Sequence, residues 1–159
     1  MENSFLEPDI QDFLRIFNQC DVQYLIVGGV SVIMHGYART TVDLDIWVNR
    51  TEENYGKICK AFQDFGMPVF DMTMENFLGN PDMDVFTFGR PPACIDLMVL
   101  VKGLDFETAF QNSIEKEIDG IAIRTLSRED LIRAKQSAGR HKDLDDAEKL
   151  KAIGDKAHG

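Results

Sequence analysis

Apolar residues recur along the chain at two spacings, one typical of helices and one typical of strands. The helical spacing predicts helices over residues 8–20, 28–37, 51–65, 105–112, 127–138 and 142–153. Alternating or continuous apolar runs predict strands over residues 22–27, 39–48, 83–88, 93–101, 114–118 and 121–125. Residues 69–80 lack a clear period, so we expect a loop or a short helix there. The mixture predicts an α/β (α+β) fold, with a small mixed β-sheet packed by helices and further helices at the C-terminal end.

Local signals mark where several of these elements begin and end. Thr51 and Ser127 are typical N-cap residues for the helices that follow them. The dipeptide Asp119-Gly120 is typical of the tight turn of a β-hairpin. No internal repeat or linker interrupts the pattern. We therefore expect one domain over residues 1–159, with its core at about 22–126 and a C-terminal helical segment at about 127–153.

Two acidic residues, Asp43 and Asp45, are placed one residue apart in a predicted strand. Alternate residues of a strand share a face, so both carboxylates lie on one side together with Arg39 and Thr41. Carboxylates that lie so close repel each other unless a cation sits between them. The pattern therefore indicates a site for a hard divalent ion held by oxygen ligands, Mg²⁺ with Mn²⁺ as the alternative.

A third acid, Asp96, stands in the middle of a nearly continuous apolar run that predicts a buried strand. An isolated carboxylate there would cost several kcal/mol unless something positive meets it. If this strand pairs beside the one that carries Asp43 and Asp45, the three acids converge. Such a cluster suits two ions that clamp a triphosphate and activate an attacking hydroxyl.

These residues occur in an order that resembles a known family. The order Gly28-Gly29, a short helix, Arg39-x-Thr41-x-Asp43-x-Asp45 and a later single acid is similar to the nucleotidyltransferase domain of the DNA polymerase β superfamily. Within it, the chain is most similar to small bacterial domains that include toxins of abortive-infection and type IV toxin-antitoxin systems. The resemblance covers roughly residues 24–146. It implies metal-binding and catalytic roles for Asp43, Asp45 and Asp96, and nucleotide-binding roles for Gly28, Gly29, Ser31, Arg39, Thr41 and Lys135.

The activity that the resemblance implies is transfer of a nucleoside monophosphate from a nucleoside triphosphate to a hydroxyl of RNA, protein or a small molecule. It also implies an antitoxin or another partner protein. Lys135 and the stretch Arg140-x-Lys142-Asp143 are similar to a further motif of the toxins, in which a lysine contacts phosphates and an acid organises the site. The chain departs from the family at Gly29, where many active members have serine, and Ser31 stands two positions later. Backbone N–H groups at Gly28 and Gly29 remain suited to phosphate.

The charge of the chain restricts its partners. Lys and Arg number 17 against 27 Asp and Glu, which gives a net charge of −10. Proteins that coat nucleic acid need a broad basic surface, so this class is excluded and any nucleic-acid contact is local. Residues 124–142 are the one basic stretch, and we expect a triphosphate or an RNA acceptor to bind there.

The remaining composition indicates a reduced, cytoplasmic protein. Cys20, Cys59 and Cys94 are widely spaced and form no zinc-binding or disulfide pattern. The N-terminus lacks the basic start and apolar core of a signal peptide, and no apolar run is long enough to span a membrane. We therefore expect no membrane partner.

Each functional interpretation has a simpler alternative. Asp43 and Asp45 also fit acids on a solvent-facing strand edge, and Arg39 fits their neutralising partner as well as a phosphate ligand. The basic stretch equally suits a solvated helix face. His35 and His141 fit structural or surface positions and are not needed for the chemistry. For the whole chain, the alternative to an enzyme is a non-catalytic module of the same fold that binds nucleotide or a partner protein.

Overall fold

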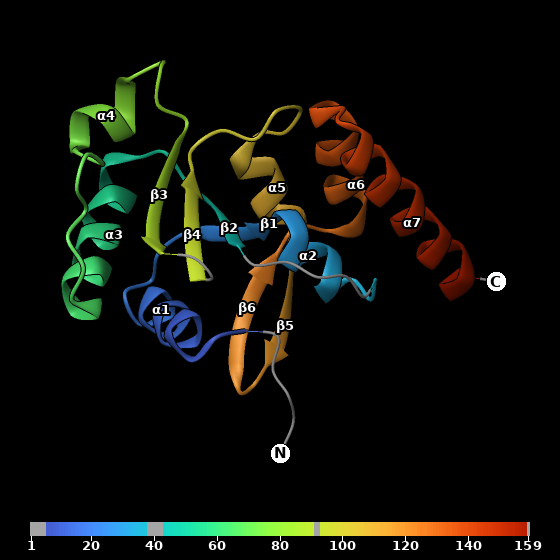
Figure 1. Cartoon of the computed structure of the whole chain (residues 1–159), viewed down its shortest axis with the longest axis horizontal. Helices are drawn as coiled ribbons and strands as arrows, with labels where there is room; N and C mark the ends of the chain where they lie inside the picture. Colours follow the sequence, from blue (N-terminus) through green and yellow to red (C-terminus); the bar gives the residue numbers. More distant parts are fainter. Residues whose placement is uncertain (1–5, 38–42, 91–92, 159) are drawn as a thin grey trace.

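The computed structural model describes residues 6–37, 43–90 and 93–158. Figure 1 shows the elements in chain order: α1 (Pro8–Gln19), β1 (Tyr24–Val27), α2 (Gly28–Met34), β2 (Asp43–Val48), α3 (Glu52–Phe65), α4 (Met74–Gly79), β3 (Val85–Arg90), β4 (Ala93–Met98), α5 (Phe106–Asn112), β5 (Ile114–Ile118), β6 (Ile121–Thr125), α6 (Arg128–Ala138) and α7 (His141–His158). Over the described ranges, none of the helices has both the length and the apolar content to cross a membrane. The predicted α+β class, a mixed sheet packed by helices, is confirmed.

The described strands form one six-stranded sheet in the order β3-β4-β2-β1-β6-β5. Strand β2 lies near the middle, antiparallel to β1 and parallel to β4. The predicted antiparallel pairing of the strands on either side of residues 89–92 is confirmed by β3 and β4. Because β1 and β4 flank β2, the glycine turn after β1 and the acid of β4 lie on either side of the two acids of β2.

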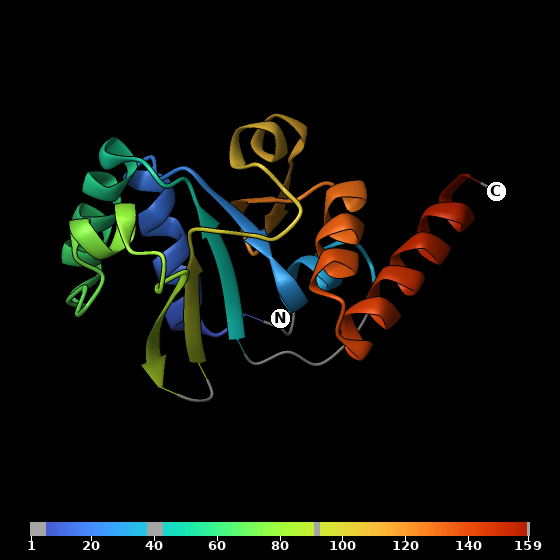
Figure 2. The same cartoon turned by 90° about the horizontal axis from the view of Figure 1, so that it is seen from above.

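Two hydrophobic cores cover the two faces of the sheet. One core joins Ile46 of β2 to Phe13 of α1 and Phe62 of α3. The other joins Trp47 of β2 to helices α5 and α6 through residues such as Phe106. Figure 2 shows α1 and α3 on one side of the sheet and α5, α6 and α7 on the other. Since successive residues of a strand face opposite ways, Asp43 and Asp45 point to the side of Trp47.

Some element boundaries differ from the sequence-based prediction. Helix α2 ends at Met34 rather than at residue 37, because Gly36 adopts the left-handed conformation with φ +102° that terminates helices. Strand β4 ends at Met98, and the apolar residues that follow leave the sheet, with Leu100 54% exposed. Helix α7 continues to His158 beyond the predicted residue 153, although Gly154 and Asp155 are weak helix formers.

Candidate active site

The sheet brings Asp45 and Asp96 together. The parallel register of β2 and β4 places Asp45 opposite Asp96 and Asp43 opposite Cys94, so the predicted adjacency of the acid-bearing strands is confirmed. Asp96 raises the pKa of Asp45 both by its negative charge and by hydrogen bonding between the two side chains. Two carboxyl groups make such a bond only when one of them keeps its proton. The pair is therefore arranged to share a positive charge, either a proton or a cation.

Gly28 packs directly against this pair. It follows β1, where Val27 lies opposite Asp45, and it adopts a positive φ of +66°. A Cβ atom built on Gly28 would lie 2.1 Å from Oδ2 of Asp45 and 2.9 Å from its Cγ. No side chain fits in that space, and only glycine adopts this backbone conformation without cost. The glycine therefore lets the backbone approach the carboxylate closely.

The environment of Asp45 opposes its ionisation. Burial is the largest cause, followed by the negative charges of Asp96 and Asp43 and by the hydrogen bond with Asp96. Together they raise the pKa of Asp45 from 3.8 to about 7, against a smaller lowering effect of the Lys135 charge. A carboxylate with a pKa this far above its usual range, beside a pocket, is typical of a functional site.

A pocket of about 150 Å³ opens beside Gly28 and Asp45. Its remaining walls come from β1, β4, the segment after β4, helix α6, the turn that follows it and the start of α7: Val27, Met98, Val101, Leu131, Ala134, Lys135, Ala138, Arg140 and Asp143. The glycine turn, the acids Asp45 and Asp143, and the cations Lys135 and Arg140 therefore line one cavity.

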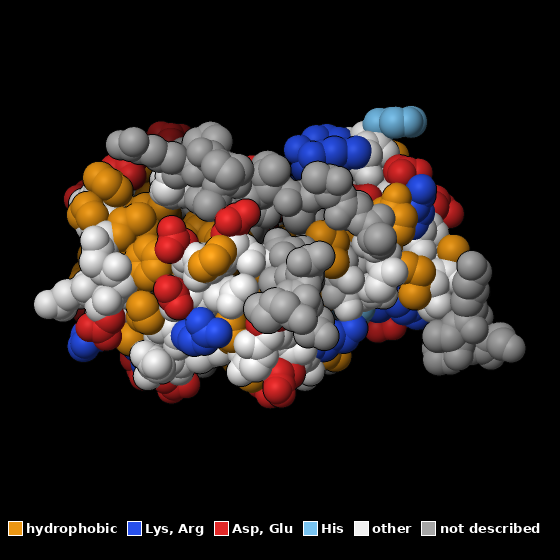
Figure 3. All heavy atoms as spheres, turned by 60° about the horizontal axis from the view of Figure 1, so that its bottom comes forward, with side chains coloured by type: hydrophobic (Ala, Val, Ile, Leu, Met, Phe, Trp, Pro, Cys, Tyr) orange, Lys and Arg blue, Asp and Glu red, His pale blue; other side chains and the backbone are white. Residues whose placement is uncertain are grey.

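Two cations are fixed at this pocket by buried acids. The Nζ atom of Lys135 lies 3.0 Å from Oδ2 of Asp146 and 3.5 Å from Oδ1 of Asp143. Arg140 donates from Nε to Oδ2 of Asp143 at 2.6 Å. Burial alone would raise the pKa of Asp143, but the hydrogen bond from Arg140 and the charges of Lys135 and Arg140 hold it below its usual value. In Figure 3, Lys and Arg side chains form one blue patch at the upper right edge of the molecule, beside a histidine, and others are scattered over the same face.

The sequence matches a family whose description agrees with this arrangement. The profile of the family described as "Nucleotidyltransferase of unknown function (DUF6036)" matches residues 9–155. The chain belongs to this nucleotidyltransferase family. A comparison with curated proteins gave no match.

Solved structures share the fold of this nucleotidyltransferase. The lincosamide antibiotic adenylyltransferase LnuA, bound to lincomycin, is 18% identical with a TM-score of 0.60, over 95% of this chain and 99% of its own. The Thermotoga maritima protein TM1012 is 18% identical with a TM-score of 0.58, over 97% of this chain and 98% of its own. A nucleotidyltransferase-like protein of Paracoccidioides brasiliensis is 18% identical with a TM-score of 0.51, over 88% of this chain and 71% of its own. At these identities the likeness establishes the common fold.

The remaining predicted ligands of the nucleotide are placed differently. Ser31 is 0% exposed, and its hydroxyl lies 2.6 Å from the Oγ1 atom of Thr125 inside the protein. Ser31 is therefore not among the residues that line the pocket, and its role toward nucleotide stays a prediction. Arg39 and Thr41 lie outside the described residues.

The acids form a pair rather than a closed metal cage. Among residues 6–37, 43–90 and 93–158, no group of three or more His, Cys, Asp or Glu side chains is gathered as a metal site. Asp43 acts on Asp45 through its charge, whereas Asp96 also makes the hydrogen bond. A cation between the carboxylates would remove the repulsion that holds them apart and draw them inward.

Asp146 is a site residue that the motif analysis did not select, whereas Arg140 belongs to the motif given for Lys135 and Asp143. Arg140 lines the pocket, and Asp146 makes the shorter ion pair with Lys135. The signal for Arg140 was its place in the basic stretch 124–142. Asp146 stands three residues after Asp143, a spacing that puts both acids on one face of a helix. The sequence did not indicate that this face turns towards α6.

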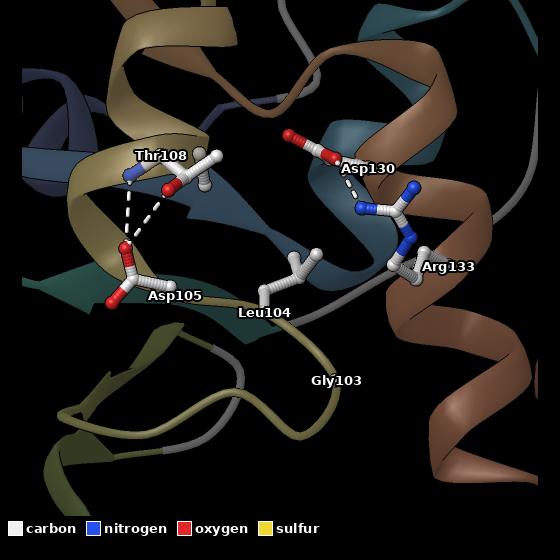
Figure 4. A pocket seen from close by; sticks show the side chains of 7 residues that line it. Gly103, Leu104, Asp105, Thr108, Asp130 and Arg133 are labelled. Atoms are coloured by element: carbon white, nitrogen blue, oxygen red, sulfur yellow. Dashed lines mark hydrogen bonds and ion pairs between the residues drawn. The ribbon is translucent and has the colours of Figure 1, made fainter.

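A second pocket, of about 230 Å³, lies between α5 and α6 (Figure 4). Its polar groups mostly bond to each other: Asp105 accepts hydrogen bonds from Thr108 at the start of α5, and Arg133 pairs with Oδ1 of Asp130 at 3.4 Å. The other oxygen of Asp130 has no hydrogen-bond partner but is enclosed by protein atoms. These contacts hold the helix ends, so we place the active site in the first pocket.

Proposed function

We propose that the protein transfers a nucleoside monophosphate from a nucleoside triphosphate to a hydroxyl acceptor, with Mg²⁺ or Mn²⁺ as its cofactor. The observation that carries this proposal is the pairing of Asp45 with Asp96 on adjacent strands beside Gly28, at a pocket lined by Lys135 and Arg140. Membership of a nucleotidyltransferase family supports it. The acids suit divalent ions, and the basic side chains suit phosphate.

The donor set fits the proposed ions. Carboxylate oxygens are the ligands that Mg²⁺ and Mn²⁺ prefer, and a cation would relieve the repulsion that raises the pKa of Asp45. We assign Asp45 and Asp96 as the central ligands and Asp43 as the third. A divalent ion bound there supplies charge stabilisation to the reacting phosphate and increases the acidity of the acceptor hydroxyl.

The other residues hold the triphosphate and its acceptor. The backbone N–H groups of Gly28 and Gly29 donate to phosphate oxygens, which the absence of side chains permits. Lys135 and Arg140 balance the negative charge of the departing pyrophosphate from the walls of the pocket. Asp96 assists removal of the acceptor proton. Asp143 and Asp146 keep Lys135 in place.

A non-catalytic nucleotide-binding module is the second candidate. It is favoured by the departure at Gly29 and by the lack, in the described part of the chain, of three gathered metal-binding side chains. This candidate predicts nucleotide binding without transfer. The enzyme and the module are therefore separated by one assay.

The assay incubates the full chain with each of the four α-³²P-labelled nucleoside triphosphates, with MgCl₂, MnCl₂ or EDTA. Total RNA, cell protein and small hydroxyl compounds serve as acceptors in parallel, the last because the fold neighbour LnuA is an adenylyltransferase of an antibiotic. We expect labelled acceptor only with a divalent ion. Asp96→Asn should abolish the label, whereas Asp119→Asn should retain it, because Asp119 is an exposed turn residue with φ 53° that asparagine adopts readily. Binding of nucleotide without labelled acceptor under every condition would favour the module.

A toxin role and an antitoxin partner form part of the same proposal. We expect expression of the active chain to slow bacterial growth, and Asp96→Asn to restore it. Equal growth of cells that express the natural chain and cells that express Asp96→Asn would contradict the toxin role. It would not contradict the transfer reaction.

Mg²⁺ should stabilise the protein more at pH 8 than at pH 5. Because the pKa of Asp45 in the folded protein is about 7, above 3.8, its protonated form adds stability that is complete below about pH 4 and lost as the pH rises through 7. Mg²⁺ replaces that proton. At pH 5 Mg²⁺ must compete with the proton bound to Asp45, whereas at pH 8 Asp45 is ionised and no proton competes. Thermal melts with and without MgCl₂ at both pH values measure the difference. An equal shift at both would contradict a metal site at Asp45.

A further inference from the structure

Thr87 lies on the edge strand β3 directly opposite Asp96. The antiparallel register pairs the two residues, so their side chains leave the sheet on the same face. The hydroxyl of Thr87 donates to Oδ1 of Asp96 at 2.7 Å. This bond comes from the side of Asp96 that faces away from Asp45, because β4 lies between β3 and β2.

The direction of the Thr87 side chain is fixed by its neighbours. Phe86 and Phe88 are each 2% exposed and belong to the core on the opposite face. Phe88 packs edge-on against Phe62 of α3, with ring centroids 4.7 Å apart. Turning Thr87 away from Asp96 would bring these rings out of the core. The β-branched side chain is also restricted in its own rotation.

A bond from this side restrains the carboxylate itself. The χ2 torsion angle of aspartate has a broad distribution, so an unrestrained carboxylate rotates easily about the Cβ–Cγ bond. Asp96 is held between the hydroxyl of Thr87 and the carboxyl of Asp45, across three neighbouring strands. Removing a group that hydrogen-bonds to a metal ligand and orients it commonly lowers metal affinity or activity about 10–100-fold.

We propose that Thr87 is a positioning residue that orients the Asp96 carboxylate for the divalent ion. This inference rests on the proposed function. Thr87 acts through Asp96 and does not contact the ion or the nucleotide. Its hydroxyl is the part that matters, since the strand position itself accepts any β-branched residue.

Thr87→Val and Thr87→Ser separate the hydroxyl from the shape of the side chain. Valine keeps the shape and favours strands, so the melting temperature without metal should stay near that of the natural protein. We expect Thr87→Val to raise the Mg²⁺ concentration for half-maximal thermal stabilisation, and to lower the transfer rate, by about 10–100-fold. Thr87→Ser, which keeps the donor, should recover most of both.

The Mg²⁺ concentration for half-maximal thermal stabilisation, measured in the Asp96→Asn background, shows whether Thr87 works through Asp96. There Thr87→Val should add little to the loss, because the carboxylate it orients is gone. Natural Mg²⁺ dependence in Thr87→Val, or an undiminished effect in the Asp96→Asn background, would overturn the inference and leave the proposed function standing. A natural protein that shows neither Mg²⁺ stabilisation nor transfer would overturn both.

Discussion

Replacing Asp45 by asparagine is expected to abolish nucleotide transfer while making the protein more stable at pH 8. The amide has the shape of the carboxylic acid but cannot carry its negative charge. Losing a ligand that stabilises the reacting phosphate removes several kcal/mol, or a factor of about 10³ or more in rate. Labelled-nucleotide transfer measures this loss.

The gain in stability follows from the repulsion around Asp45. At pH 8 the folded protein holds Asp45 ionised beside Asp96 and Asp43, against a pKa raised to about 7. Asparagine removes that cost, which we place at about 1–2 kcal/mol after solvent screening. For a domain of this size that is roughly 2–8 °C in melting temperature. The gain should shrink towards pH 5, where the natural residue is protonated.

Asp119→Asn is the matched control for Asp45→Asn. It removes the same charge at an exposed turn between β5 and β6. We expect it to leave the transfer rate unchanged and to show no comparable pH-dependent gain. An Asp45→Asn protein that transfers nucleotide at the natural rate, or that is destabilised at pH 8, would contradict the assigned role of Asp45.

Replacing Gly28 by alanine is expected to reduce transfer about 100-fold or more and to destabilise the protein. The added methyl group would lie 2.1 Å from Oδ2 of Asp45, so the carboxylate must move. A displacement of about 1 Å at a catalytic group costs on the order of 10² in rate. The left-handed backbone at φ +66° adds about 1–2 kcal/mol of strain for any residue with a Cβ.

Gly66→Ala is the control that separates the effect of backbone strain at positive φ from the effect of displacing the Asp45 carboxylate. Gly66 ends α3 with a positive φ of +87°, but a Cβ there would meet nothing within 4 Å. We expect this variant to lose stability, measured by thermal melting, and to keep its transfer activity per folded molecule. Equal loss of activity in the two alanine variants would show that Gly28 matters for folding alone.

The shared face of Asp43 and Asp45 was predictable, because side chains of a β-strand alternate between its two faces with a period of two residues. Alternation alone places Asp43 and Asp45 opposite Leu44 and Ile46, which are 2% and 0% exposed. The apolar run around Asp96 likewise predicts a buried strand. Its exact register against β2 depends on the whole path through α3, α4 and β3, which no local pattern contains.

Contacts between distant segments were not predictable from motifs. The partner of Ser31 is Thr125, which lies far along the chain, so its burial leaves no signal near Ser31. The ion pairs of Lys135 depend on how α7 packs on α6. Helical periodicity identifies each helix but not the face that turns towards its neighbour.

The central claim is that Asp45 and Asp96 jointly hold a divalent ion beside a bound triphosphate. The most direct measurement is a crystal structure with Mn²⁺ and a non-hydrolysable nucleoside triphosphate, in which anomalous scattering locates the metal. We predict a Mn²⁺ peak within coordination distance of both carboxylates, with phosphate oxygens facing the N–H groups of Gly28 and Gly29. A nucleotide bound in this pocket without metal at the pair, or metal bound elsewhere, would contradict the claim.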